Sequence, residues 1–277
     1  MKTISVLMSV YQSEVPQYLD RALQSIWTDQ TLKPNEVILI QDGKLGNELL
    51  AVISKWQNIL KDKLIIHCNK ENLGLTKSLN IGLTYATGKY IARMDSDDIS
   101  HPQRFEKQVS FLNDHPEVSV VGGSLQEFNA DNICLNVRHY PHNDTEVLKY
   151  IYKASPLAHP TVMIRRSLFT SGLRYNEKYR TSQDIALWFD ALCAGFQIAN
   201  IDDVTIYFRR ENDVFKRRSR EKAFNEFNIY ISGIYRLYGL LTWKYIYPIS
   251  RLCFRLLPVS AVKWIYDSKF RKILLNK

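Results

Sequence analysis

Cysteines are few in this sequence, and they form no recognisable set. Four occur in 277 residues, with no CxxC pair and no histidine at metal-ligand spacing from any of them. This scarcity argues against a disulfide framework and against a thiolate zinc site. We expect all four to be buried, small apolar residues in a protein of a reducing compartment. They are Cys68, Cys134, Cys193 and Cys253.

Long apolar runs are also missing. No stretch approaches the ~18 apolar residues that suggest a membrane-spanning helix. The first residues, MKTISVLMSVYQ, lack the apolar core and small-residue cleavage site of a secretory leader, so we expect them to form a first strand. A GxGxxG fingerprint is absent after that strand, which argues against a nicotinamide-dependent oxidoreductase.

Acidic residues are nearly absent from the C-terminal part. Residues 1–215 carry 23 Lys/Arg against 25 Asp/Glu, whereas residues 229–277 carry 9 against 1 and include ten aromatic side chains. Basic groups among Tyr, Trp, Phe and Leu are typical of helices that lie in a membrane interface. A helical subdomain with a solvated basic face is the main alternative. RNA binding is disfavoured, because the apolar content is high and no recognition module is visible.

Strand-like and helical patterns alternate through the first half of the chain. Near-continuous apolar strands separated by amphipathic helices predict an α/β fold with a mostly parallel sheet covered on both faces. In such sheets ligands bind beyond the carboxyl ends of the strands. The apolar, β-branched runs lie at residues 4–10, 36–42, 64–68, 90–95 and 118–123.

The pattern loosens after about residue 130. We expect a helix over residues 144–153 and a strand over residues 159–166. The segment SQDIALWFDALCAG predicts a helix that ends at Gly195, a residue type favoured just after a helix. VTIYFRR, residues 204–210, predicts a last strand.

Three carboxylates crowd into four residues in MDSDDISHPQRF, directly behind an apolar run. In an extended segment residues i and i+2 point to the same side, so Asp95 and Asp97 can face one ligand. Their hard oxygen atoms suit Mg²⁺ or Mn²⁺ held together with a substrate's phosphates. The segment lacks the Asp/Asn and Gly spacing of an EF-hand. The alternative is a solvated turn in which an aspartate acts as a cap.

Weaker signals stand at other strand and helix ends. Asp42, in IQDG, can hydrogen-bond a ribose or a base, or simply form an Asp-Gly turn. In NLGLTKSLN, Asn72 and Gly74 precede a helix, where free N–H groups can face a phosphate or ribose. Asp184, in SQDIALWF, is either a general base or a residue that favours the helix dipole behind a Ser182 N-cap.

The order of these motifs closely resembles that of family 2 glycosyltransferases of the GT-A fold. The resemblance covers roughly residues 1–215 and rests on VLMSVYQ, EVILIQDG, NLGLTKSLNIG, YIARMDSDD followed by HPQRFEKQ, and QDIALW, in that order. It implies a nucleotide-sugar-binding half over residues 1–125 and an acceptor half over residues 126–215. Residues 216–277 would then be a basic, amphipathic, membrane-associating helical tail.

The resemblance also implies roles for individual residues. Asp95 and Asp97 would hold Mn²⁺ or Mg²⁺ against the diphosphate of a UDP-sugar donor. Asp184 would be the base that deprotonates the acceptor hydroxyl, and a single base opposite the leaving group implies inversion. The sugar nucleotide would lie against Ser9, Tyr11, Asp42, Asn72, Gly74, Asp95 and Asp98.

Two positions depart from the family pattern. The glutamate that precedes the family's catalytic aspartate is Gln183 here, which removes a charge near the acceptor. The histidine of a later YRxH pattern is missing from YFRREND. Arg209, Arg210 or His159 are therefore candidates for acceptor or phosphate contacts, and a structural role is the alternative for His159.

The chain looks like bacterial transferases that add glucose or galactose to a lipid-linked N-acetylhexosamine during O-antigen or capsule synthesis. We therefore expect a peripheral enzyme on the cytoplasmic face of the inner membrane, with an undecaprenyl-diphosphate-linked sugar as acceptor and no nucleic acid partner. One rival is a sugar nucleotidyltransferase, which would need a Gly-rich, Arg-bearing loop after the first strand. The other is a catalytically degenerate scaffold, which Gln183 and the missing histidine motivate.

Overall fold

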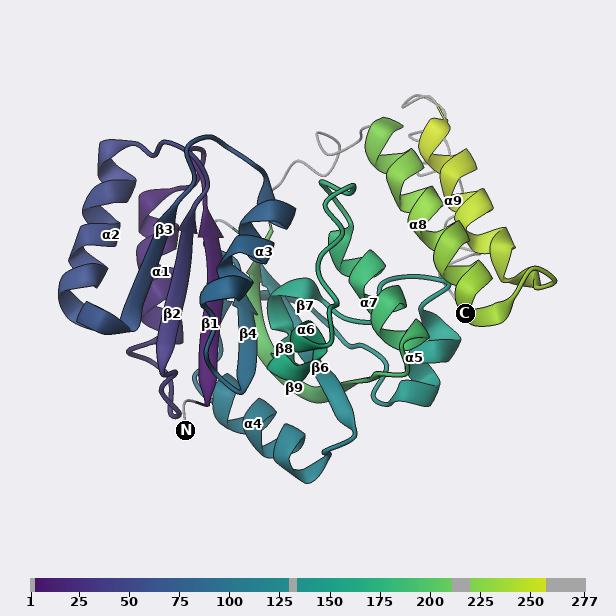
Figure 1. The fold of residues 1–277 in the computed structure, drawn as a ribbon, viewed down its shortest axis with the longest axis horizontal. Helices are drawn as coiled ribbons and strands as arrows, with labels where there is room; N and C mark the ends of the chain where they lie inside the picture. Colours follow the sequence, from purple (N-terminus) through teal and green to yellow (C-terminus); the bar gives the residue numbers. More distant parts are fainter. Residues whose placement is uncertain (1–2, 130–133, 211–219, 258–277) are drawn as a thin grey trace.

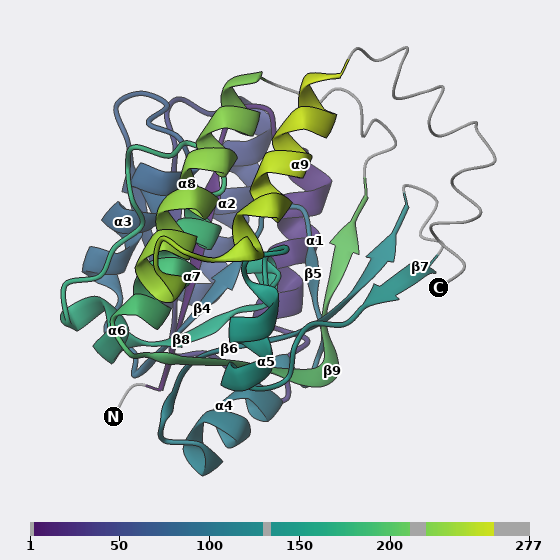
Figure 2. The ribbon, with the colours of Figure 1, turned by 90° about the vertical axis from the view of Figure 1, so that its right-hand side faces the viewer.

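The computed structural model describes residues 3–129, 134–210 and 220–257, which form one nine-stranded sheet flanked by helices (Figures 1 and 2). Its strand order is β3-β2-β1-β4-β8-β6-β9-β5, and β7 pairs with β6 outside this path. The first four strands are mutually parallel, as the alternating pattern predicts. They are β1 (Ile4–Val10), β2 (Glu36–Gln41), β3 (Leu64–Cys68) and β4 (Tyr90–Met94).

Both faces of this parallel half are covered by helices. The alternation of β1 sends Val6 and Met8 into one apolar cluster and Leu7 into the other. Helices α1 (Pro16–Ile26), α2 (Asn47–Leu60) and α4 (Arg104–Asp114) pack on the first side. Helices α3 (Leu75–Tyr85) and α7 (Gln183–Cys193) pack on the second side. The two-sided burial explains why the strands read as continuous apolar runs.

The second half of the sheet is mixed. β8 (Met163–Arg165) lies antiparallel between β4 and β6 (Val118–Phe128), and β9 (Gln197–Arg209) runs parallel to β6. β5 (Ile99–Ser100) pairs with β9, and β7 (Cys134–Arg138) pairs with β6, both antiparallel. The β5–β9 pairing places the end of β9 beside the segment that follows β4.

Several boundaries differ from those expected. The predicted strand over 159–166 shortens to β8, because residues 159–161 form a 3₁₀ turn around Pro160, which has no N–H for a ladder. Helix α5 (Asp144–Tyr150) is shorter than predicted, and β9 begins seven residues before the expected strand. The expected end of α7 is confirmed. Gly195 follows it with φ +81°, and its N–H donates to Leu192 at 3.1 Å.

The C-terminal part of the described chain is a pair of helices that lie side by side (Figures 1 and 2). Helix α8 (Arg220–Tyr238) packs on α7, and α9 (Ile246–Leu256) packs on α8. The α7–α8 contact is close, since a Cβ on Gly233 would lie 2.3 Å from the Phe189 ring. No helix in the described ranges is long and apolar enough to cross a membrane.

The expected burial of the cysteines is wrong. All four side chains are free thiols on the surface. Cys68 ends the outermost strand β3, and Cys134 begins β7, all of whose residues are exposed. Cys193 and Cys253 lie on α7 and α9 and are likewise exposed. Each position belongs to a sheet edge or an outer helix face, which the scattered spacing in the sequence does not reveal.

Candidate active site

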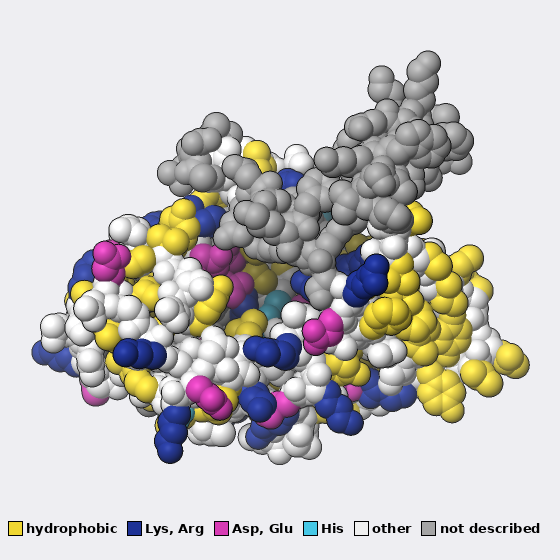
Figure 3. Space-filling model, turned by 90° about the horizontal axis from the view of Figure 1, so that it is seen from above, with side chains coloured by type: hydrophobic (Ala, Val, Ile, Leu, Met, Phe, Trp, Pro, Cys, Tyr) yellow, Lys and Arg dark blue, Asp and Glu magenta, His cyan; other side chains and the backbone are white. Residues whose placement is uncertain are grey.

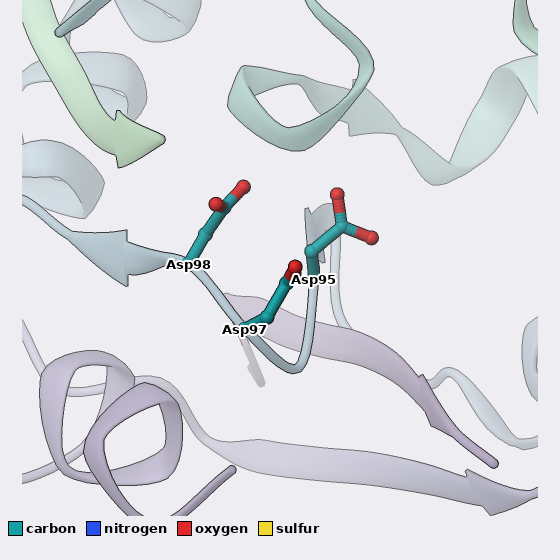
Figure 4. Close-up of side chains that lie close together, drawn as sticks. All are labelled: Asp95, Asp97 and Asp98. Carbon is teal, nitrogen blue, oxygen red and sulfur yellow. The ribbon is translucent and has the colours of Figure 1, made fainter. Parts of the chain in front are cut away.

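The acidic segment directly follows β4, at the sheet edge where the parallel strands end. The carboxylate oxygens of Asp95, Asp97 and Asp98 lie within 4.8 Å of one another. Figure 4 shows the three side chains pointing to the same side of their loop. Viewed from above, the molecule is hollowed in the middle of this face, and acidic side chains line the hollow (Figure 3). The structure therefore brings together the three carboxylates that the sequence singles out.

The electrostatics of this cluster fit a divalent cation. Burial and the neighbouring carboxylate of Asp95 raise the pKa of Asp97 to about 6. Burial, together with the carboxylates of Asp95 and Asp97, raises the pKa of Asp98 well above its ordinary value. The backbone N–H of Arg209 donates to Oδ1 of Asp98 at 2.8 Å, whereas Oδ2 is buried without a partner among the described residues. A hard cation such as Mg²⁺ or Mn²⁺ would offset the repulsion between these carboxylates and give the buried Asp98 oxygen a partner.

Two arginines that the sequence reasoning missed lie beneath the cluster. Arg93 on β4 is buried, and both of its terminal nitrogens donate to the two carboxylate oxygens of Asp95. Arg104 on α4 is fully buried and donates to the carbonyl oxygens of Arg93 at 2.8 Å and Val162 at 3.2 Å. Burial and the nearby Arg93 charge lower the pKa of Arg104 to about 9. The sequence did offer a signal for Arg93: it is a basic residue within an apolar strand, two positions before Asp95 and therefore on the same side of an extended chain.

Of the two arginines predicted at the end of the last strand, one joins the cluster. The Nε of Arg209 donates to the carbonyl oxygen of Asp97 at 3.0 Å. Its guanidinium lies 3.7 Å from the ring centroid of Tyr18 and 4.5 Å from that of Phe128, so aromatic rings hold it in place. Arg210 instead pairs with Glu127, a buried residue of β6.

Asp184 lies in the first turn of α7, where its carboxyl is half-buried. Burial raises its pKa, while the N–H of Ile185 and the Arg93 charge act in the opposite direction. The preceding Gln183 is buried. Ser182 occupies the N-cap position, as the alternative interpretation expects, but its φ is 61° and its side chain makes no capping hydrogen bond. A left-handed serine is strained by about 1 kcal/mol, a cost often found near functional groups.

His159 is packed as a core residue. Its Nε2 lies 2.9 Å from the Tyr175 hydroxyl, and its ring meets Trp188 edge-on. Burial lowers the pKa of the imidazole well below 6.5, and the Arg93 charge adds to this effect. These contacts favour the structural interpretation of His159.

The Asp42 carboxylate holds the loop before α3 in place by hydrogen bonds. It accepts hydrogen bonds from the N–H groups of Leu73 at 2.7 Å and Gly74 at 2.9 Å, and from Asn69 Nδ2 at 3.0 Å. The N–H of Gly74 is therefore engaged by Asp42, so any N–H groups that face a phosphate or ribose here would be others at this loop-to-helix junction. Gly43, with φ +88°, permits this contact, since a Cβ there would lie 2.8 Å from the Asn72 nitrogen.

The remaining predicted residues lie around the same edge. Ser9 is half-buried near the end of β1, and Tyr11 just beyond it is exposed. A cavity of about 320 Å³ opens beside the loop before α3. Its lining includes Arg180, which sequence reasoning missed and whose guanidinium lies close to Gly74. Asn72, Leu73, Gly74 and Lys77 also line it.

This mostly parallel, curled sheet, with an acidic cluster after a central strand and a carboxylate at the start of α7, has the GT-A architecture of nucleotide-diphospho-sugar transferases. The chain belongs to glycosyl transferase family 2, whose model matches residues 5–172. The family expected from the motifs is therefore confirmed.

Two bacterial relatives match almost the whole chain. The amylovoran biosynthesis glycosyltransferase AmsE of Erwinia amylovora is 33% identical over 271 residues, covering 95% of this chain and 97% of AmsE. The UDP-Gal:alpha-D-GlcNAc-diphosphoundecaprenol beta-1,3-galactosyltransferase of Escherichia coli is 33% identical over 275 residues, covering 98% and 97%.

Two solved structures share the fold. S. aureus TarS 1–349 in complex with UDP superposes with a TM-score of 0.65 at 19% identity, over 98% of this chain and 76% of that one. The mannosyltransferase PcManGT of Pyrobaculum calidifontis, in complex with GDP-Man and Mn²⁺, gives 0.64 at 14% identity, over 96% and 79%.

Proposed function

We propose that this glycosyltransferase moves a hexose, glucose or galactose, from a UDP-sugar to a lipid-diphosphate-linked N-acetylhexosamine, with inversion and with a divalent metal ion. The observation that carries the proposal is the acidic cluster after β4, with its unsatisfied Asp98 oxygen. The names of the two bacterial relatives support a role in surface polysaccharide synthesis, and one of them acts on a lipid-linked GlcNAc.

The donor would bind at the strand ends. Asp95 and Asp97 would hold Mn²⁺ or Mg²⁺, and the bound ion would neutralise the charge that develops on the leaving diphosphate. Arg209, fixed between two rings, would direct its remaining N–H groups to a phosphate in place of the missing histidine. Ser9, Tyr11, Asn72, Gly74 and Asp98 would surround the sugar nucleotide, and Asp42 would shape the loop at residues 72–74.

The acceptor would be activated by Asp184. A sugar hydroxyl attacks poorly unless a base takes its proton as the new bond forms. Burial of Asp184 raises its proton affinity towards the range in which such a base works at neutral pH. Gln183, adjacent and uncharged, would orient the acceptor by hydrogen bonding.

The α8–α9 turn is the part of the described chain that we assign to the membrane. Leu241 is 97% exposed, Leu240 71% and Trp243 63%. Figure 3 shows hydrophobic side chains gathered at this end of the molecule. Arg251 and Arg255 pair with Glu226, so the basic side chains counted in the sequence are partly engaged within the protein.

We therefore propose peripheral attachment to the cytoplasmic face of the inner membrane, with these apolar side chains entering the lipid interface. The rest of the predicted basic tail lies outside the described residues. Flotation with anionic vesicles tests the assignment: Leu241→Asp should weaken binding severalfold, and the distant Leu50→Asp should not. Equal flotation of both variants and the parent would refute attachment through this turn.

The proposed reaction is tested with the full chain, a panel of UDP-sugars, Mn²⁺ and a synthetic N-acetylglucosaminyl-diphospho-lipid. Product mass and UDP release are followed with and without EDTA. An EDTA-sensitive mass gain of one hexose supports the proposal. UDP binding without transfer to this acceptor contradicts the acceptor assignment, and failure to bind any nucleotide favours the degenerate scaffold.

A further inference from the structure

Arg93 lies beside the acidic cluster, although an arginine side chain can act neither as a general base nor as a metal ligand. Its side chain is 5% exposed, and the Asp95 side chain that it holds is 29% exposed. Both lie on the same side of an extended segment, two residues apart. The fork of two N–H donors engages both carboxylate oxygens, which fixes the plane as well as the position of the carboxylate.

This hold leaves Asp95 able to bind a ligand. Each carboxylate oxygen has two lone pairs, and the arginine fork uses one on each. The second lone pair of each oxygen stays available to a metal ion. An Asp95 without its arginine would rotate, and it would be pushed away by Asp97 and Asp98 within the 4.8 Å cluster.

The backbone holds Arg93 rigidly in turn. Its N–H donates to the carbonyl oxygen of Val162 at 3.0 Å, and its own carbonyl oxygen accepts from Arg104 at 2.8 Å. Two buried arginines whose charges repel one another are a poor choice for stability alone, because replacing buried charged groups by apolar residues is often neutral or stabilising. The arrangement is explained if the positive charge is needed where it lies.

The charge of Arg93 also acts on groups outside the acidic cluster. It acts on the carboxylates of the acidic cluster. It also opposes the rise that burial causes in the pKa values of Tyr175 and Asp184, and it adds to the fall that burial causes in the pKa of His159. The other charged or titratable groups that act on Asp184 or respond to it are Glu226 and Tyr230 of α8, together with Tyr175. Among these groups Arg93 is the cation, so it helps to keep Asp184 ionised against the effect of burial.

We propose that Arg93 is a positioning residue that orients Asp95 for the divalent ion, and that its buried positive charge also acts on Asp184. The inference rests on the proposed function of the site. It predicts two separable effects of removing Arg93: weaker binding of the metal ion, and a shift in the pH dependence of turnover.

The test compares Arg93→Met and Arg93→Lys with the control Arg165→Met. Arg165 lies on the neighbouring strand β8, and its guanidinium donates to the backbone oxygens of Val118 and His115 rather than to a carboxylate. Mn²⁺ binding is measured without any sugar nucleotide, from the electron paramagnetic resonance signal of free Mn²⁺. The pH dependence of kcat is measured separately with the full chain.

We expect Arg93→Met to weaken Mn²⁺ binding about 10–100-fold, the usual effect of losing a partner that orients a metal ligand. It should also move the acid limb of the kcat profile to higher pH. Arg93→Lys keeps the charge but not the fork, so it should weaken Mn²⁺ binding without moving the acid limb. Arg165→Met should change neither.

Wild-type Mn²⁺ affinity and an unmoved acid limb in Arg93→Met would overturn the inference, as would equal losses in the Arg165 control. If Arg93→Met does not fold, Arg93→Lys decides, and unchanged Mn²⁺ affinity in that variant overturns the orienting role. Failure of the parent protein to bind Mn²⁺ or to turn over would instead count against the proposed function of the site.

Discussion

Asp98 and Arg209, which are 111 positions apart in the chain, are joined at the site by a hydrogen bond of 2.8 Å from the Arg209 N–H to Asp98 Oδ1. The same arginine donates from Nε to the carbonyl oxygen of Asp97. The end of β9 thereby fixes the loop after β4. It also leaves the second oxygen of Asp98 buried, with no partner in the described chain. The site is thus organised before any ligand binds, a condition that favours electrostatic catalysis.

Asp184→Asn removes the proposed base while keeping the shape of the side chain. We expect kcat to fall roughly 10²–10⁴-fold, the usual contribution of a general base. Binding of UDP, measured by calorimetry, should stay within about twofold, because Asp184 does not face the nucleotide in this proposal. Full activity of the variant would remove Asp184 from the mechanism.

The rate should depend on pH through the same residue. Asp184 must be ionised to accept a proton, and burial raises its pKa above the ordinary 3.8. Turnover is therefore lost as the pH falls through the raised pKa, and the acid limb should lie above that of an exposed aspartate. Measuring kcat from pH 4 to 8 at saturating donor and metal checks this. A kcat that stays constant as the pH falls towards the ordinary aspartate pKa of 3.8 would contradict this expectation.

Asp97→Asn tests the metal site. Because the bound ion is expected to supply several kcal/mol of charge stabilisation, kcat/KM should fall roughly 10²–10³-fold. The matched control is Asp114→Asn, at the end of α4. Mn²⁺ titration of both variants separates loss of binding from loss of fold, and a wild-type Mn²⁺ affinity in Asp97→Asn would argue against the assignment.

Arg209 and Arg210 are adjacent but have different partners, so they form a natural pair of variants. Arg209→Met should lower kcat/KM roughly 10–100-fold through the loss of a charged hydrogen bond to phosphate. Arg210→Met should have little effect on kcat/KM, since its guanidinium pairs with Glu127. Steady-state kinetics with varied UDP-sugar distinguish them, and equal effects would contradict a specific phosphate contact.

His159 should make the folded state sensitive to acid. Its pKa is lowered by burial, so below about pH 6.5 the unfolded chain takes up a proton that the folded state resists. The free energy of unfolding should then fall by up to about 1.4 kcal/mol per pH unit, in addition to any fall caused by the other titrating groups. Urea unfolding of the parent and of His159→Phe between pH 5 and 7 compares the two slopes. Identical slopes would show that His159 does not titrate in this way.

Much of the fold could be predicted because its causes are local. β1 to β4 follow from apolar runs separated by amphipathic segments, and Asp95 to Asp98 follow directly from the end of β4. Boundaries near Pro160 and in β9 were missed, because tertiary pairing decides where a ladder stops. The hydrogen bonds from the N–H groups of Leu73 and Gly74 to Asp42 could not be foreseen for the same reason, since Asp42 lies at the end of a different strand.

By itself the sequence determined the parallel α/β core, the acidic segment behind a central strand and the family pattern. Periodicity and spacing along one chain segment are sufficient for each of these. Only the tertiary structure decided that Arg209 braces the acidic loop, that Asp42 fastens the loop at residues 72–74, and that His159 is buried on Tyr175. Such contacts depend on how distant segments meet in a close-packed interior, and no local pattern encodes that meeting.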